Sequence, residues 1–305
     1  MHYFSFRRAV IFLTLAVGFF SVCSTNHNKE KEKGGIPIVV SILPQKYFVE
    51  KVGGDFVDVS VMVEPGSSPH LYEPKPSRIA ALTNAKLYFS IGVEFEKAWI
   101  PRFKEVAPGL VVVPLDSGIT RIPMAYSFQE HSGGVGEDLR ADDGARAPDP
   151  HIWLSPELVK NMVKIITGHL CRIDPAHALE YRKNGDYFLM RIQELQDSIR
   201  IYLQESNVTK FIVFHPSWGY FAEEFGLWQI PIEIEGREPS PKQLQHVIDF
   251  AKKNNITTIF VQPQFSRKTA ETIASQINGT VVPIDPLAYN WDTNLLAVAN
   301  ALVGR

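Results

Sequence analysis

Three histidines in this chain stand directly beside a proline, and an Asp-Pro pair follows them. The four residues are His70, His151, His215 and Asp285. Three imidazole nitrogens and one carboxylate oxygen form a tetrahedral donor set that suits a borderline cation such as Zn²⁺, so these residues together predict a metal site. They lie far apart in the sequence, unlike the closely paired ligands of a zinc finger. The fold must therefore bring them together.

The sequence around these residues favours that interpretation. His215 and Asp285 each follow an apolar run, 210–214 and 280–284, of the kind that forms a buried parallel strand. His70 lies in a loop after a strand-like alternating segment. Ligands of open α/β sheets bind beyond the carboxyl ends of the strands, and a neighbouring proline restricts the loop that presents the side chain. The other histidines lack this setting and are expected to be structural or solvated: His2, His27, His169, His177 and His246.

The N-terminus has the pattern of an export signal. A basic start is followed by an apolar run that ends at Val22, which is too short for a membrane span and typical of a signal peptide over residues 1–22. Cys23 stands where a bacterial lipoprotein would carry its lipid. Simple cleavage nearby is the alternative. Residues 23–35 are polar and charged, and they predict a flexible tether. The mature chain is therefore expected outside the cytoplasm, in the periplasm or cell envelope.

The rest of the chain alternates between strand and helix patterns, which predicts βα units with parallel sheets. We expect an N-terminal βα lobe over residues 36–174, a linking helix over 175–205 and a C-terminal βα lobe over 206–305. The linking segment has a Gly but no Pro after its first turn, and Asp174-Pro175 forms a good helix start. Strands are expected at 37–43, 57–63, 86–91, 110–115, 210–214, 229–233, 257–261 and 280–284.

A segment at 124–148 differs from its surroundings. It is rich in glycine and acidic residues and has few large apolar side chains, which predicts a mobile surface loop within the first lobe. Its acids and its single histidine, His131, could attract metal weakly. A solvated acidic insertion with no such role is the alternative.

The motifs around the predicted ligands resemble those of a known family, the metal-binding solute receptors of bacterial ABC importers, in its zinc and manganese class. The resemblance covers about residues 36–305. The segments that carry it are Ser41-Ile42-Leu43-Pro44, Ser68-Pro69-His70-Leu71-Tyr72-Glu73-Pro74, Asp149-Pro150-His151-Ile152-Trp153-Leu154, Phe214-His215-Pro216-Ser217-Trp218-Gly219-Tyr220-Phe221, Glu235-Gly236-Arg237-Glu238-Pro239-Ser240 and Asp285-Pro286-Leu287.

The resemblance implies two βα lobes joined by one rigid helix, with the metal in the cleft between the lobes. It implies His70, His151, His215 and Asp285 as ligands and Zn²⁺ as the transported ion, because zinc receptors have His at the third position where manganese receptors have Glu. Glu73 and Arg237 are candidates to orient the ligands. Zinc members often carry a His-rich loop before the second ligand, whereas the loop 124–148 has one His.

The implied partner is the membrane permease of an ABC importer, which a monomeric, lipid-anchored receptor would serve. Manganese is the alternative cargo within the same class. An exported zinc enzyme and a surface adhesin are alternatives from other classes. Against an enzyme, the chain has no His-Glu-x-x-His, Gly-x-Ser-x-Gly or P-loop motif. Its formal net charge is −2 and it has no basic stripe with interleaved aromatics, so nucleic acid is excluded as a partner.

Overall fold

The computed structural model describes residues 1, 34–125, 147–233 and 237–304. The predicted signal peptide, Cys23, the tether up to residue 33 and residues 126–146 of the predicted loop lie outside this part. The chain divides into two units, Met1–Lys33 and Gly34–Arg305, and the second contains all of the fold described below. Within the described residues, no helix combines the length and the apolar character needed to cross a membrane.

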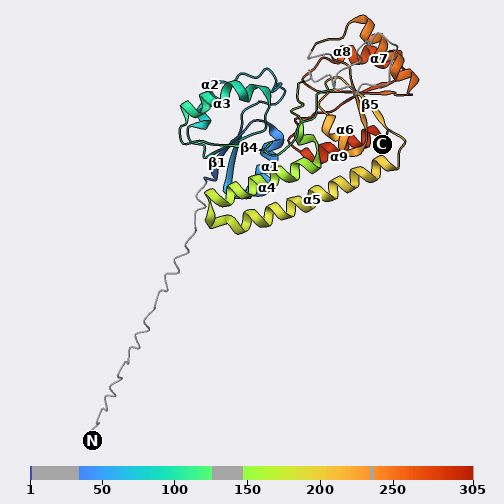
Figure 1. Ribbon diagram of the computed structural model, residues 1–305. Coiled ribbons are helices and arrows are strands. Elements are labelled where there is room, and N and C mark those ends of the chain that lie inside the picture. Colours follow the sequence, from blue (N-terminus) through green and yellow to red (C-terminus); the bar gives the residue numbers. More distant parts are fainter. Residues whose placement is uncertain (2–33, 126–146, 234–236, 305) are drawn as a thin grey trace. The chain divides into compact units, whose positions relative to one another are not determined.

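Two four-stranded parallel sheets form the framework (Figure 1). The first has the order β2-β1-β3-β4, and the second has the order β6-β5-β7-β8, so both halves repeat one topology. All neighbouring strands pair in parallel. The strands are β1 Ile36–Val40, β2 Val57–Val61, β3 Leu87–Ser90, β4 Val111–Pro114, β5 Lys210–Val213, β6 Trp228–Pro231, β7 Thr258–Val261 and β8 Thr280–Pro283. The predicted α/β class with two βα lobes is therefore confirmed.

Helices connect the strands, as parallel pairing requires. Proline at the first turn begins several of them, and Ser240 caps α7 through a capping box with Gln243. In the first lobe the helices are α1 Leu43–Gly53, α2 Pro76–Leu82 and α3 Glu94–Val106. In the second they are α6 Gly219–Phe225, α7 Pro241–Lys253, α8 Arg267–Gln276 and α9 Trp291–Leu302. The strand predicted from residue 37 ends three residues early, because α1 begins at Leu43.

Along the chain, two long helices rather than one connect the last strand of the first sheet to the first strand of the second. Helix α4 spans Pro156–Ile173 and helix α5 spans Ala178–Gln204, and the two pack side by side (Figure 1). Asp174 was predicted to begin the linking helix, but it ends α4 and precedes a single 3-10 turn, Pro175–His177. Helix α5 has 27 residues, so it is about 40 Å long at 1.5 Å per residue. The long helix is thus confirmed, with a second helix paired to it.

Helix α5 contacts elements that come from both ends of the chain, α1 and α9. Phe188 of α5 lies 5.8 Å, centroid to centroid, from Tyr47 of α1, and Phe48 of α1 lies 5.2 Å from Trp291 of α9. Gly185 permits the close approach of α4, because a Cβ there would lie 2.5 Å from Thr167 Oγ1. These buried aromatic contacts make α5 a rigid brace between the lobes.

The two ends of the predicted acidic loop meet. Pro123 and Pro148 form an antiparallel bridge, and Met124 N donates a hydrogen bond of 2.9 Å to Ala147 O. The chain therefore enters and leaves the segment 126–146 at one point, so its removal leaves no gap to span.

We predict that replacing 126–146 by Gly-Gly leaves the fold and the metal affinity intact. The replacement leaves Ala125-Gly-Gly between Met124 and Ala147, and a three-residue turn is a common connection between bridged antiparallel segments. The free energy of unfolding should change by less than about 1 kcal/mol. Thermal unfolding and zinc titration of the shortened protein test this. Loss of the cooperative transition, or of tight zinc binding, would contradict it.

Candidate metal centre

The side chains of His70, His151 and His215 converge on one point. Their possible ligand atoms all lie within 4.8 Å of one another, and His70 Nε2 lies 3.2 Å from His215 Nε2. Two nitrogens bound to one zinc at 2.0–2.1 Å with a tetrahedral angle lie about 3.3–3.4 Å apart. The observed spacing is therefore close to that of two ligands on one zinc ion.

Loops from both lobes supply these histidines. His70 lies between β2 and α2, and His215 follows β5 of the second sheet. His151 precedes the short 3-10 helix Ile152–Leu154 that leads into α4. His70 and His215 thus lie in loops beyond the carboxyl ends of β2 and β5, as the sequence predicts for them. The three histidines connect the two lobes, because His215 of the second lobe contacts the rings of His70 and His151, and these two rings also contact each other.

A carboxylate holds the Nδ1 atom of every one of these rings. The pairs are His70 with Glu94 at 2.8 Å, His151 with Asp149 at 2.7 Å and His215 with Glu233 at 2.6 Å. A ring that donates its Nδ1 proton to a carboxylate keeps its Nε2 lone pair free for a metal, and the hydrogen bond fixes the orientation of the ring. The three pairs therefore form a preorganised set of Nε2 donors.

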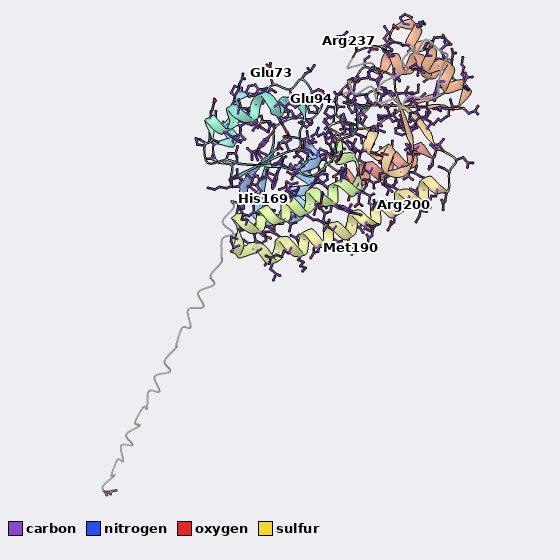
Figure 2. All side chains as sticks on the ribbon, viewed as in Figure 1. Glu73, Glu94, His169, Met190, Arg200 and Arg237 are labelled. Carbon is purple, nitrogen blue, oxygen red and sulfur yellow. The ribbon has the colours of Figure 1, made fainter. Side chains whose placement is uncertain are left out.

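Sequence reasoning missed these orienting carboxylates. The candidates Glu73 and Arg237 are both exposed, and other residues contact the Nδ1 atoms of the rings (Figure 2). A signal was present: Glu94 follows β3 and Glu233 follows β6, at the same sheet edges that identified the ligands. Asp149 stands two residues before its histidine and also accepts a hydrogen bond of 2.8 Å from His151 N.

Burial differs among the three rings. His151 is 3% exposed and His215 is 7% exposed, whereas the His70 side chain retains 23% exposure. His215 stacks on Phe265 with centroids 5.0 Å apart, and Trp153 flanks His151. The site thus has apolar walls on its deep side and is most accessible at His70.

The protonation of the site follows from this burial. Burial favours the neutral form and lowers the pKa of His151 well below its usual value, and burial raises the pKa of Asp149 to about 7. Burial alone would lower the pKa of His70 too, but the hydrogen bond and charge of Glu94 outweigh it and raise that pKa. His151 is therefore ready to bind a cation at neutral pH, while His70 competes more readily for a proton.

The carboxylate of Asp285 lies outside the group formed by the three rings. Its Oδ1 accepts hydrogen bonds from Leu287 N at 2.9 Å and from Gln264 Nε2 at 3.3 Å. It lines a small pocket with Glu64, whereas the three histidines line a neighbouring one. Leu287 borders both pockets, so Asp285 is near the histidines in the fold without sharing their centre.

The histidines expected to be structural lie elsewhere in the described residues. His177 stacks on Phe56, and its Nδ1 lies 2.7 Å from Asp174. His169 lies on α4 and His246 on α7, both partly exposed. Among the described residues, no second group of possible metal ligands is found. His2, His27 and His131 lie outside the described residues.

Known proteins are similar to this chain in sequence and in fold. Residues 38–298 match the model of the family described as "ZnuA: Zinc-uptake complex component A periplasmic". The Bacillus subtilis protein named "High-affinity zinc uptake system protein ZnuA" is 30% identical over 268 residues, which are 87% of this chain and 82% of that protein.

Solved structures agree with this match. A crystal structure of ZnuA is 42% identical, with a TM-score of 0.80, and the match covers 89% of this chain and 99% of that one. A ZnuA deletion mutant lacking 138–173, solved with zinc bound, is also 42% identical, with a TM-score of 0.78 and coverage of 88% and 97%. This chain therefore belongs to the zinc-uptake complex component A family of ABC-importer solute-binding proteins.

Proposed function

We propose that this protein is an extracytoplasmic receptor that captures Zn²⁺ with high affinity and delivers it to the permease of an ABC importer. The convergence of the His70 and His215 Nε2 atoms at 3.2 Å, a spacing close to that of two nitrogens on one zinc ion, carries the proposal. The zinc-uptake name of the Bacillus subtilis relative and the zinc-bound ZnuA structure support it.

The proposed ligands are His70, His151, His215 and Asp285. In this proposal the Asp285 carboxylate turns away from Leu287 N and Gln264 Nε2 toward the ion, so binding exchanges two hydrogen bonds of a carboxylate for a metal bond. Four protein ligands would leave no open position for an activated water, which favours a receptor over a zinc hydrolase.

Elemental analysis tests the function directly. Protein purified without chelators should contain about one zinc per chain, and chelator-stripped protein should recover the same content from an equal mixture of Zn²⁺ and Mn²⁺. Zinc content well below one per chain, with another metal in its place, would refute the zinc assignment.

We further propose that lipid at Cys23 anchors the mature protein to the membrane. The cysteine follows an apolar run and precedes a polar segment, which is the order that an anchored lipoprotein needs. Cys23→Ser should move the protein from the membrane fraction to the soluble fraction. A mature N-terminus that starts beyond residue 23 would contradict this proposal.

Zinc binding should weaken as the pH falls. Protons compete with the metal for the imidazole nitrogens, and the reference pKa of histidine is about 6.5. A raised pKa increases the protonated fraction at a given pH, so His70 should begin to lose metal at a higher pH than an unperturbed histidine. We expect affinity to fall more than about tenfold between pH 7.5 and 5. Equal affinities at the two pH values would exclude imidazole ligation.

A further inference from the structure

We propose that Gln262 is a positioning residue that sets zinc affinity by holding the backbone of His215. This inference rests on the proposed zinc site and names a residue that contributes no ligand atom to it. Gln262 follows β7 directly and is 1% exposed.

The side-chain amide of Gln262 forms hydrogen bonds with both the backbone N–H and the backbone C=O of His215. Its Oε1 accepts a hydrogen bond of 3.2 Å from His215 N, and its Nε2 donates one of 2.6 Å to His215 O. The same Nε2 lies 3.1 Å from Ser217 Oγ, which it also reaches as a donor. The amide therefore clamps the turn that carries His215 from outside the turn itself.

The turn needs such a clamp because of its sequence. Pro216 has no N–H to donate, so the turn can form few internal hydrogen bonds. One of them is the bond that Ser217 N donates to His215 O at 2.8 Å. Glu233 and Phe265 orient the ring about its own bonds, but they do not fix the Cα from which it extends. Ligands must be held within about 0.5 Å of their productive positions, so a freed backbone would degrade the site.

A second glutamine provides a matched control. Gln45 is fully buried in the first lobe, where its Oε1 accepts from Ser41 N at 2.9 Å and its Nε2 donates to Phe89 O at 2.9 Å. It also clamps a turn just after a strand, but that turn presents none of the proposed metal ligands. Loss of Gln45 should therefore cost stability without changing the metal site.

The test compares Gln262→Met with Gln45→Met, since methionine keeps the length of the side chain and removes its hydrogen bonds. Both variants should unfold at lower temperature than the parent. Only Gln262→Met should weaken zinc binding, by about 10- to 100-fold, the range found when partners that orient ligands are lost. It should also alter the visible absorption of bound Co²⁺, which reports ligand geometry. Zinc affinity is measured by competition with a chromophoric chelator on metal-free protein, well below the unfolding temperature.

The outcomes separate this inference from the proposed function. If the parent fails to bind zinc, the proposed function is wrong. If the parent binds zinc and Gln262→Met binds it equally well, or if both glutamine variants lose affinity alike, the positioning role is wrong. Should Gln262→Met fail to fold, Gln262→Asn retains the amide but is too short to reach both His215 atoms. It should weaken zinc binding to a smaller extent, and parent-like affinity in it would also refute the role.

Discussion

Replacing His215 by alanine will weaken zinc binding by about 100-fold or more, because the change removes a donor itself, and loss of a residue that merely orients a ligand already costs 10- to 100-fold. The change also leaves Glu233, 4% exposed, without the ring that its Oε1 contacts. A buried carboxylate without its partner destabilises the fold, so the metal-free variant should also unfold at lower temperature. Competition titration and thermal unfolding measure the two effects separately.

The other ring ligands should give the same loss of affinity with different costs in stability. His151→Ala leaves the fully buried Asp149 without its ring partner, so it should destabilise the metal-free protein. His70→Ala should destabilise it least, since Glu94 has 43% of its side chain exposed and can turn to water.

Two histidines outside the site are the matched controls. His169→Ala and His246→Ala remove partly exposed rings from helices α4 and α7, and both variants should keep the affinity of the parent. Parent-like zinc affinity in His215→Ala, or a comparable loss in either control, would show that the three-ring group is not the zinc site.

The sequence predicted the fold well because the signals of a parallel α/β sheet are local. Most of the eight described strands are short apolar runs and β2 alternates apolar and polar residues, and the sequence predicts each within a few residues. Helix α4 is not among the elements predicted from the sequence. Its start nevertheless has a helix signal, Ser155 as the N-cap followed by Pro156, and it has a buried face formed by Val159, Met162, Val163 and Ile166. Its β-branched stretch at 165–167 favours a strand by propensity, and packing against α5 outweighs that preference.

Three of the proposed ligands, His70, His215 and Asp285, carry two signals in the sequence, a donor side chain and a position beyond a strand. Their orienting carboxylates share the second signal, but acidic residues are common in loops, so the chain offers many equivalent candidates. Pairing Glu94 with His70 or Glu233 with His215 depends on which loops the sheet order brings together. Which loops meet depends on tertiary structure, which the local sequence does not reveal. The same holds for the hydrogen bonds that Asp285 accepts from Gln264 and Leu287.

The chain should select zinc over manganese in direct competition. Three imidazole nitrogens suit zinc, whereas manganese favours more ligands and harder oxygen donors, and for a given set of donors zinc lies well above manganese in the Irving–Williams order. The three Nδ1 carboxylates reinforce this choice by fixing the rings, with the Nε2 atoms of His70 and His215 at a spacing close to the tetrahedral one. Copper and nickel should also bind in vitro, since affinity alone does not separate them from zinc.

His215→Glu is the variant that tests the origin of this preference. It replaces a nitrogen donor with an oxygen donor at a ring that contacts both of the other rings, so it should narrow the difference in affinity between zinc and manganese. The new carboxylate also faces Glu233 across the space left by the ring, and the repulsion between them should destabilise the metal-free variant. The measurement is competition at equal free concentrations of Zn²⁺ and Mn²⁺, for parent and variant. Preferential retention of manganese by the parent would overturn the zinc assignment and leave the family membership standing, because that membership rests on sequence and fold.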